Sequence, residues 1–352
     1  MLRFALVGCG RIAKRHSELL GHKQIPGAEL AAVCDVVEER AKGIAKQFQV
    51  PYYLDMDEMM KKESVDVVAV LTPSGLHAQQ VIRLAKYGKH ILVEKPMALT
   101  LQDADAMIRA CDENRVRLFV VKQNRFNVPV VKLREALEAK RFGKLVMGTV
   151  RVRWSRDQAY YDQDAWRGTW AMDGGVLANQ ASHHIDMLEW MMGEVESVFA
   201  KSATALVDIE AEDTAVAVLK FKSGAMGIVE ATTSVRPRDL EGSISILGEK
   251  GTVVIGGFAV NTMEVWNFVE PLAGDSQVLQ KFSVNPSNVY GYGHQAYYEH
   301  VVKFINSGER HLVDGPEGRK SVELINAIYE SIETGREVLL GSQFHKTRLG
   351  KR

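Results

Sequence analysis

The first 120 or so residues alternate short apolar runs with amphipathic stretches, and this alternation constrains the fold more than any other feature of the sequence. The apolar runs are nearly continuous valine, isoleucine and leucine, which is typical of strands buried on both faces of a parallel sheet. The stretches between them have helical spacing, so each predicts a helix that connects one strand to the next. Strands are predicted at 3–7, 29–34, 65–71, 89–94 and 117–121, with helices near 12–22, 37–47, 75–87 and 101–114.

The pattern changes after Arg125. A helix is predicted near 129–139, followed by an alternating run at 144–156 and several strand-like runs within 195–270. Turn sequences between these runs, such as Gly248-Glu249-Lys250-Gly251, predict antiparallel neighbours, and helical patterns return near 294–307 and 317–337. We therefore predict an α/β chain with a doubly wound parallel sheet of the Rossmann type over 1–122. An α+β domain on an open, mostly antiparallel sheet should span 123–340, and a frayed basic tail 341–352.

The charges of the chain balance, with 44 basic and 44 acidic side chains, so no net field attracts nucleic acid or an anionic membrane. The apolar run at the N-terminus is too short for a signal peptide, and no apolar stretch reaches the ~20 residues of a membrane helix. Cys9, Cys34 and Cys111 lack a CxxC spacing, which argues against a zinc site or a disulfide framework. These features predict a cytoplasmic protein with no metal, no nucleic-acid partner and no membrane partner.

A glycine loop, Gly8-Cys9-Gly10-Arg11-Ile12-Ala13, follows the first predicted strand. In a dinucleotide-binding turn Gly8 allows the tight bend, Gly10 the close approach of the backbone to a pyrophosphate, and Ala13 the packing of helix on strand. The phosphates would bind the free N–H groups that open the helix. Asp35 ends the second strand, where a carboxylate accepts bonds from both ribose hydroxyls and repels a 2′-phosphate. This arrangement favours NAD over NADP, although Asp35 could also cap the helix predicted at 37–47.

Polar residues follow the third and fourth strands of this domain, at the edge where open parallel sheets bind their ligands. Thr72, Pro73 and Ser74 come after the third strand, and His77 lies just beyond them. Ser74 could contact the cofactor or cap a helix, and His77 could line a nicotinamide pocket or face solvent. Glu94-Lys95-Pro96 follows the fourth strand, where the proline fixes the turn and can adopt a cis bond that holds the lysine over the cleft.

The segment 174–186, GGVLANQASHHID, is predicted to be a helix that the glycine pair opens and Gly193 ends. Asn179 and His183 would then lie on one face, with Asp186 one turn from the imidazole. An imidazole here and an ammonium at Lys95 are groups that can take a proton from an alcohol while hydride leaves its carbon. A zinc site is not expected, because no cysteine is near and the two adjacent histidines point in different directions.

Residues 122–170 combine basic and aromatic side chains. Arginine forks and amide donors suit a carboxylate or a diphosphate, and aromatic rings could stack on a base or a sugar. Arg151 and Arg153 alternate with valines, so they could instead form the solvent face of one strand. The set comprises Lys122, Asn124, Arg125, Arg151, Arg153, Arg156 and Arg167, interleaved with Trp154, Tyr160, Tyr161 and Trp166.

The glycine loop, Glu94-Lys95-Pro96 and the block from Gly174-Gly175 to Asp186 together resemble the Gfo/Idh/MocA family of oxidoreductases over nearly the whole chain. The resemblance implies a Rossmann domain, a C-terminal domain for substrate binding and oligomer contacts through its open sheet, and Lys95 and His183 in the active site. The chain departs from the family pattern at Asn179, where an aspartate is common, and at Ala181, where glycine is usual. With QAYYDQDAWRGTW before it, this variant is similar to family members that oxidise UDP-N-acetylglucosaminuronate at C3 in bacterial surface-polysaccharide (O-antigen, lipopolysaccharide) synthesis.

The resemblance implies NAD-dependent oxidation of that UDP-sugar uronate to its 3-keto product by a dimer or tetramer. His183 would take the hydroxyl proton, with Lys95 the next candidate base, and cationic Lys95 would stabilise the developing alkoxide. Asn179 would orient the substrate. Predicted cofactor contacts are Gly8, Gly10, Arg11, Ile12, Ala13, Asp35, Thr72, Pro73, Ser74, His77, Glu94, Lys95 and Gln123. Predicted substrate contacts are Lys95, Asn124, Arg156, Tyr160, Arg167, Asn179 and His183.

Two other functions stay open. The first is a free-sugar or inositol dehydrogenase on the same fold, which would not depend on the nucleotide. The second is a dinucleotide-binding regulator without catalysis, against which the presence of both Lys95 and His183 argues. For a dehydrogenase, the NADH could leave after each turnover or be recycled in place by an oxo-acid substrate.

Overall fold

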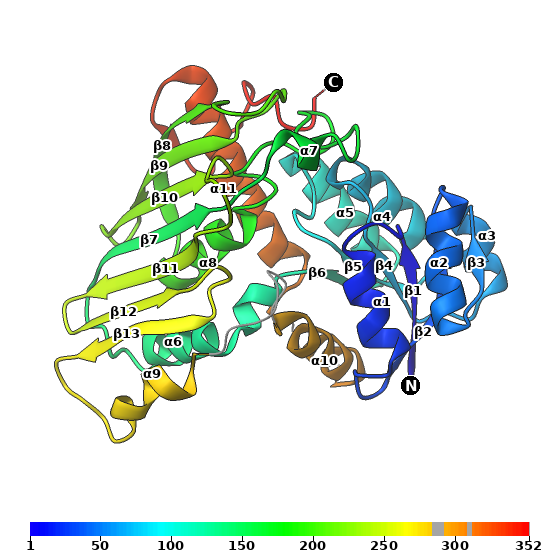
Figure 1. Ribbon diagram of the computed structural model, residues 1–352, viewed down its shortest axis with the longest axis horizontal. Helices are drawn as coiled ribbons and strands as arrows, with labels where there is room; N and C mark the ends of the chain where they lie inside the picture. The colour runs from blue at the N-terminus through cyan, green and yellow to red at the C-terminus, as the bar shows by residue number, and fades with distance from the viewer. Residues whose placement is uncertain (284–291, 308–311, 352) are drawn as a thin grey trace. The chain divides into compact units, whose positions relative to one another are not determined.

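The computed structural model describes residues 1–283, 292–307 and 312–351, and the chain divides into two compact units (Figure 1). Unit 1 comprises residues 1–122 and 294–319, and unit 2 comprises residues 123–293 and 320–352. Among the described residues, no helix combines the length and the apolar character needed to cross a membrane.

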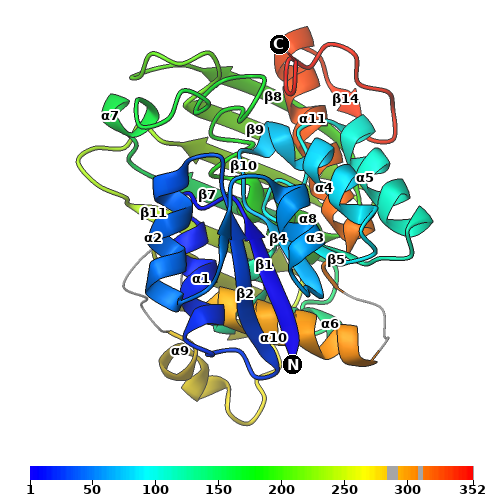
Figure 2. The ribbon, with the colours of Figure 1, turned by 90° about the vertical axis from the view of Figure 1, so that its right-hand side faces the viewer.

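Unit 1 is built on a six-stranded sheet in the order β3-β2-β1-β4-β5-β6, and all of its pairings are parallel. Its central strands bury nearly every side chain, because helices lie on both sides of the sheet (Figure 2). The predicted doubly wound fold is confirmed. The strands are β1 (Leu2–Val7), β2 (Ala28–Cys34), β3 (Tyr52–Tyr53), β4 (Val67–Val70), β5 (His90–Val93) and β6 (Leu118–Val120).

The helices that connect these strands follow the predicted spacing, except that a short strand and a short helix lie between α2 and β4. The sequence analysis missed the two-residue strand β3 and the short helix α3, which begins after Asp55, whose side chain accepts the backbone N–H of Glu58 at 2.9 Å. The helices of this part are α1 (Ala13–Gly21), α2 (Glu38–Phe48), α3 (Met56–Lys62), the 3-10 turn η1 (Ser74–Leu76), α4 (His77–Ala85) and α5 (Leu101–Glu113).

Unit 1 also contains most of α10 (Gly293–Ser307) and the start of α11 (Gly315–Thr334), which the sequence analysis assigned to the second domain. Tyr298 of α10 is fully buried, and its ring centroid lies 5.5 Å from that of Phe4 in β1. The backbone N–H of Val120 in β6 donates to the carbonyl of Val313 at 2.8 Å. Helical periodicity locates an apolar face but not the domain that covers it, which explains the different assignment.

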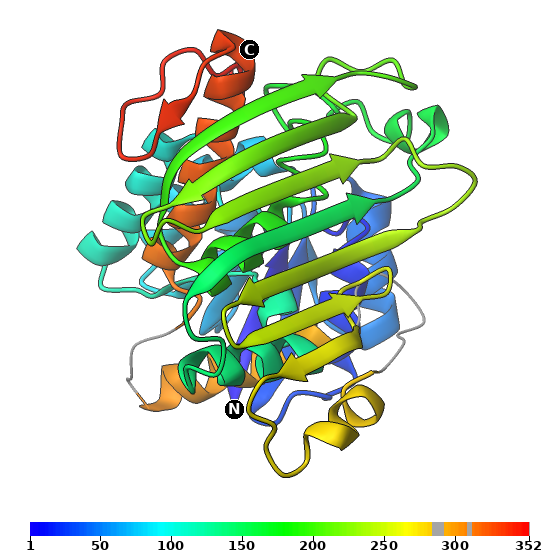
Figure 3. The ribbon, with the colours of Figure 1, turned by 90° about the vertical axis from the view of Figure 1, so that its left-hand side faces the viewer.

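Unit 2 contains an eight-stranded sheet in the order β13-β12-β11-β7-β10-β9-β8-β14. The pairings are antiparallel except for β7 with β10, which agrees with the predicted open, mostly antiparallel sheet. Figure 3 looks onto the face of this sheet that carries no helix. The strands are β7 (Leu145–Arg153), β8 (Val195–Ala203), β9 (Thr214–Phe221), β10 (Met226–Thr232), β11 (Glu241–Gly248), β12 (Gly251–Gly256), β13 (Thr262–Phe268) and β14 (Val338–Leu339).

Helices and turns of unit 2 lie on the other side of this sheet or at its ends, and α8 packs against β7 and β11. Gly148 of β7 gives α8 its room, since an added Cβ would lie 2.7 Å from side-chain atoms of Leu188 and Met192. The elements are η2 (Gln123–Phe126), α6 (Val128–Glu138), α7 (Gln158–Tyr161), α8 (Ser182–Met192), η3 (Asp275–Gln277), α9 (Val278–Lys281) and the rest of α11.

The described part of the C-terminal tail, 341–351, packs against the rest of unit 2, which differs from the predicted frayed end. Leu349 is buried, and the backbone N–H of Gly350 donates to the Trp170 carbonyl at 2.8 Å. The guanidinium of Arg348 lies 4.3 Å from the centroid of the Trp170 ring and pairs with Glu333 at 2.5 Å. Basic composition alone suggested fraying, and these long-range contacts are not visible in a local pattern.

Candidate active site

The glycine loop opens α1 as the sequence predicts. Gly8 has a φ of 97°, and a Cβ there would lie 2.8 Å from the carbonyl carbon of Leu71, so only glycine fits without strain. A Cβ on Gly10 would meet nothing within 4 Å, which leaves space for a group as large as a phosphate beside the backbone. Ala13 is fully buried under the sheet, Ile12 is half-buried, and Arg11 is exposed.

Asp35 connects this loop to the helix that follows β2. One carboxylate oxygen accepts the backbone N–H of Cys9 at 2.6 Å, and the other accepts the N–H of Val37 at 2.8 Å. The carboxylate is half-buried and holds its place before α2. The N-cap of α2 is Val37 and no side chain caps the helix, so the predicted capping role of Asp35 is wrong. Its carboxylate oxygens each have two lone pairs and can also accept from a ribose hydroxyl.

His77 forms hydrogen bonds with two turns at the carboxyl edge of the parallel sheet, the one after β4 and the one after β5. Its Nδ1 lies 2.9 Å from the Pro96 carbonyl oxygen, and its Nε2 lies 2.8 Å from the Thr72 carbonyl oxygen. The side chain is buried, and burial lowers its pKa below the ordinary value of 6.5. The alternative of a solvent-facing helix histidine is therefore wrong. Pro73 precedes η1 and the buried Ser74 begins it, so both lie at this same edge.

The Lys95-Pro96 peptide bond is cis, as predicted, and Lys95 is half-buried directly after β5. Glu94, which precedes it, is buried, and both of its carboxylate oxygens accept hydrogen bonds. Oε1 lies 2.9 Å from Nε2 of His16, and Oε2 accepts the backbone N–H of Lys95 at 2.9 Å. Burial alone would raise the pKa of Glu94, but the His16 hydrogen bond and the charges of His16, His294 and Lys95 lower it to about 2.

The sequence analysis did not identify His16, which lies one turn into α1 and is fully buried. Atoms of His16, Glu94 and His294 that could bind a metal lie within 4.8 Å of one another. The 2.9 Å between His16 and Glu94 is a hydrogen-bond distance, whereas two ligands of a tetrahedral zinc lie about 3.3 Å apart. Nδ1 of His16 lies 2.6 Å from the Tyr298 hydroxyl. We interpret this cluster as a hydrogen-bond network.

In unit 2, His183 lies in the first turn of α8 and contacts Gln123. The two Nε2 atoms are 2.8 Å apart, and both side chains are buried. Oε1 of Gln123 is buried and has no hydrogen-bond partner among the described residues. Gln123 is predicted to contact the cofactor, and its amide lies beside the candidate base His183. Asn124, the next residue, is also buried in η2.

Arg125 and Asp186 fix α8 to the η2 turn. Two guanidinium nitrogens of Arg125 each donate to a carboxylate oxygen of Asp186 at 2.8 Å, and the hydroxyl of Ser321 donates to the same carboxylate at 2.9 Å. All three side chains are buried. Buried bidentate pairs of this kind are geometrically specific, so they fix the orientation of the helix that carries His183.

The helix predicted from the glycine pair at 174 begins only at Ser182, so Asn179 and His183 do not share a helix face. Asn179 lies in the turns before α8, where its side-chain amide donates to Asp173 at 2.5 Å. The other Asp173 oxygen accepts the backbone N–H of Gly168 at 2.8 Å. The predicted end is confirmed, since Gly193 follows the last helical residue with a φ of 93°.

Glu212 forms hydrogen bonds with the backbone of the turns that precede α8. Its Oε1 accepts the backbone N–H of Leu177 at 3.0 Å and the hydroxyl of Tyr329 at 2.9 Å, while its backbone carbonyl accepts from Val176 at 2.9 Å. Gly175 is required here, because a Cβ would overlap with the Glu212 carbonyl oxygen. Burial raises the pKa of Glu212 to about 7, and the nearby charge of Asp173 adds to the increase.

Two predicted substrate arginines converge on α7. The guanidinium carbons of Arg167 and Arg156 lie 4.6 and 5.4 Å from the centroid of the Tyr160 ring. Arg167 donates to the Tyr160 hydroxyl at 2.9 Å, and Arg156 pairs with Asp239 at 2.9 Å. The result is an aromatic cluster with two arginines within unit 2, and each arginine also pairs with an aspartate, Arg156 with Asp239 and Arg167 with Asp164 at 3.2 Å.

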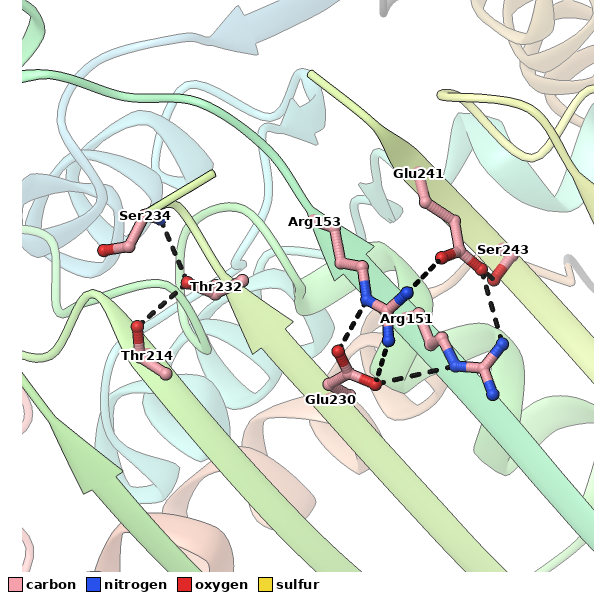
Figure 4. A network of polar contacts seen from close by, with 8 residues as sticks. All are labelled: Arg151, Arg153, Thr214, Glu230, Thr232, Ser234, Glu241 and Ser243. Carbon is pink, nitrogen blue, oxygen red and sulfur yellow. Dashed lines mark hydrogen bonds and ion pairs between the residues drawn. The ribbon is translucent and has the colours of Figure 1, made fainter. Parts of the chain in front are cut away.

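Arg151 and Arg153 do not join this cluster. They lie on the helix-free face of the sheet, where they form ion pairs with Glu230 and Glu241 of the neighbouring strands (Figure 4). The shortest of these contacts joins Arg153 Nε and Glu230 Oε1 at 2.6 Å. The solvent-face alternative is therefore the correct one for both arginines.

Family models match both parts of the chain. The model described as the oxidoreductase family with an NAD-binding Rossmann fold matches residues 2–122, and the GFO/IDH/MocA C-terminal domain matches residues 130–254. Myo-inositol 2-dehydrogenase of Thermotoga maritima is 34% identical over 349 residues, 96% of this chain and 98% of that protein.

Two solved structures are similar over nearly their full length. The WlbA dehydrogenase from Bordetella pertussis, in complex with NADH and UDP-GlcNAcA, is 43% identical with a TM-score of 0.93, covering 97% of this chain and 98% of that one. The WlbA dehydrogenase from Chromobacterium violaceum, in complex with the same two ligands, is 43% identical with a TM-score of 0.91, covering 97% of each chain.

Proposed function

Since the chain belongs to the Gfo/Idh/MocA family of oxidoreductases and its unit 1 is an NAD-binding Rossmann domain, we propose that it oxidises UDP-N-acetylglucosaminuronate at C3 to the 3-keto sugar. The observation that carries the proposal is the similarity, at 43% identity, to two dehydrogenases whose structures hold that nucleotide sugar and NADH. Family membership as an NAD-dependent dehydrogenase does not by itself select a substrate, because one fold serves many secondary alcohols.

The surface around Tyr160 supports an anionic nucleotide sugar. Arg156 and Arg167 flank one aromatic ring, so a carboxylate or diphosphate could bind the guanidinium groups while a ring of the ligand stacks nearby. An uncharged polyol has no group that would use two arginines. In the proposed complex these residues hold the substrate, together with Asn124 and the Asn179 amide.

The proposed chemistry assigns one step to each of two side chains. His183 accepts the proton of the C3 hydroxyl, and the ammonium of Lys95 stabilises the negative charge that develops on that oxygen. NAD supplies the acceptor for the hydride. Gln123 contacts the His183 ring at 2.8 Å and restrains its orientation, while Arg125 and Asp186 restrain the helix beneath it.

The residues of unit 1 fit the cofactor. Space beside Gly10 admits a pyrophosphate at the start of α1, and Asp35 lies where an adenosine ribose would present its hydroxyls. Asp35→Ala should weaken NAD binding more than NADP binding, by about 1.5–3 kcal/mol for each charge-assisted bond lost. Dissociation constants from fluorescence titration test this role, and an unchanged preference for NAD would exclude it.

Single-turnover NADH absorbance tests the substrate. UDP-N-acetylglucosaminuronate should reduce bound NAD, and UDP-N-acetylglucosamine, which differs only at C6, should do so more slowly by orders of magnitude. The filter arises because a substrate without the carboxylate lacks the acceptor for the charge-assisted hydrogen bonds that a binding arginine would donate. Equal signals from the two sugars would reject the uronate assignment and leave the family-level activity intact.

A second candidate is oxidation of a free polyol, favoured by the 34% identity to a myo-inositol 2-dehydrogenase over 96% of this chain. The same assay with myo-inositol and with free sugars separates the two candidates, since a polyol dehydrogenase would not need the nucleotide.

We place the reaction in the cytoplasm, in the synthesis of surface polysaccharide, because the three cysteines are free thiols typical of a reducing compartment. We further propose that the protein assembles as a dimer or tetramer through the helix-free face of the unit 2 sheet. That face exposes Phe199, Val216, Val218 and Met226 beside the ion pairs of Figure 4. Light scattering and sedimentation measure the oligomer directly.

A further inference from the structure

A buried polar network joins three separate segments of unit 1. His16 comes from α1, the helix that the glycine loop opens, Glu94 follows β5, and Tyr298 comes from α10 near the other end of the chain. The hydroxyl of Tyr298 lies 2.6 Å from Nδ1 of His16, and Nε2 of His16 lies 2.9 Å from Oε1 of Glu94. None of the three residues is more than 6% exposed.

The network ends on the backbone of Lys95. The second carboxylate oxygen of Glu94 accepts the N–H of Lys95 at 2.9 Å, so the carboxylate is held from one side by His16 and holds the lysine turn on the other. The charged and titratable groups around it are His16, His77, His294, Lys95, Tyr297 and Tyr298. A carboxylate held in this way cannot rotate without breaking a buried hydrogen bond.

The roles of donor and acceptor follow from the chemistry. Burial and the charge of Glu94 raise the pKa of Tyr298 well above 10, so the phenol keeps its proton. The phenol donates to Nδ1 of a neutral His16 ring and accepts from Nδ1 of a protonated one, so in both cases the N–H on Nε2 donates to Glu94. Tyr298 thereby fixes the ring so that this N–H faces the carboxylate.

We propose that Tyr298 and His16 are positioning residues for Lys95, which act through the Glu94 carboxylate. This inference rests on the role given to Lys95 in the proposed function. Neither residue contacts the reacting atoms in this account. Their effect is to fix the backbone from which the lysine ammonium reaches the substrate oxygen, and loss of that fixation lowers the rate of the chemical step.

Tyr298→Phe removes the hydroxyl and keeps the ring that packs on Phe4. We expect kcat with the nucleotide sugar to fall roughly tenfold, since small misplacements of a catalytic group lower the rate by such factors, while KM and the dissociation constant of NAD change less than twofold. In a Lys95→Ala background the same substitution should produce no further loss. A purely structural role would lower kcat by the same factor in both backgrounds.

Tyr53→Phe is the matched control. Its hydroxyl also forms a hydrogen bond of 2.6 Å, here to the carboxylate of Glu63, in the same unit and on the edge strand β3. This variant should retain the kcat of the unchanged protein.

His16 gives a second test that does not depend on Tyr298. His16→Gln can still present an amide N–H to Glu94, so it should retain several times the kcat of His16→Leu, with thermal unfolding used to check that both variants are folded. Equal kcat values for these two variants, or a Tyr298→Phe variant within twofold of the unchanged protein, would overturn the inference. Normal turnover in Lys95→Ala alone would instead reject the role of Lys95 in the proposed function.

Discussion

Glu94 in unit 1 and Glu212 in unit 2 are both buried carboxyl groups next to a segment that carries a candidate catalytic residue. Their pKa values move by similar amounts in opposite directions, to about 2 for Glu94 and to about 7 for Glu212. Burial raises both, so burial does not explain the difference. Glu94 faces His16, His294 and Lys95, whereas the Glu212 carboxyl group accepts from a backbone N–H and a phenol and lies near the charge of Asp173.

The comparison shows what decides the ionisation of a buried carboxyl group here. Neutral donors satisfy its lone pairs but do not offset the cost of removing a charge from water, whereas a cationic neighbour does. The turn that carries Lys95 is therefore held by an ionised Glu94 at neutral pH. The turns before α8, the helix that carries His183, are held by Glu212, which exchanges its proton near neutral pH.

The largest expected effects concern the catalytic groups that the two segments carry. His183→Asn should leave NAD binding intact and lower turnover by roughly two to four orders of magnitude, the range for a lost general base. Lys95→Ala should lower it comparably. Stopped-flow NADH absorbance measures both, with NAD titration as the control. Near-normal turnover of either variant would show that the replaced residue is not catalytic.

Glu94→Gln should destabilise the fold. A pKa of about 2 in place of the ordinary 4.5 contributes about 3 kcal/mol, present above pH 4.5 and lost as the pH falls toward 2. Urea unfolding should therefore show the deficit at pH 7 and a narrowing difference from the unchanged protein between pH 4.5 and 3. Glu38→Gln, at an exposed carboxylate, is the control. A deficit that does not depend on pH would mean that shape rather than charge stabilises this region.

Glu212→Gln should have the opposite effect on the pH dependence. The folded protein favours protonated Glu212, so this contribution is present below pH 4.5 and is lost as the pH rises through about 7. Glutamine keeps the acceptor for Leu177 and Tyr329 and does not ionise. Between pH 5 and 8 the variant should gain about 2 kcal/mol relative to the unchanged protein, as measured by urea unfolding. Parallel stability curves would show that Glu212 stays in one protonation state.

Arg153→Ala should have the smallest effect, although Arg153 contacts two glutamates. The pairs lie on the helix-free sheet face, where solvent screens them, so we expect the free energy of unfolding of the dissociated chain to fall by about 0.5 kcal/mol. Urea unfolding at low protein concentration measures this. A loss comparable to that of Glu94→Gln would show that the number of ionic contacts matters more than burial.

Much of unit 1 could be predicted from the sequence because its signals are local. A few neighbouring residues are enough to recognise the continuous apolar strands, the glycine loop and Asp35. The structure has each of them at the expected position in the fold. The Lys95-Pro96 turn was found in the same way, since a proline after a strand end restricts the backbone.

The failures involve partners that are distant in sequence. The predicted start of α8 is too early because Glu212, which follows α8 and β8 in the chain, holds the turns before Ser182. His16 was overlooked because its significance depends on Glu94 and Tyr298, which lie 78 and 282 residues away. Arg151 and Arg153 were grouped with the substrate arginines because residues close in sequence can face opposite sides of a strand.

The segment 294–319 completes unit 1 only after most of the chain has been synthesised. N-terminal domains generally fold first as they leave the ribosome, but here residues 1–122 emerge without the helix that covers Phe4 and pairs with His16. We expect stalled nascent chains that end before residue 290 to remain protease-sensitive in their first 122 residues. Released full-length chains should be protected. The order of synthesis would thus delay the cofactor-binding part of this enzyme until its far end is available.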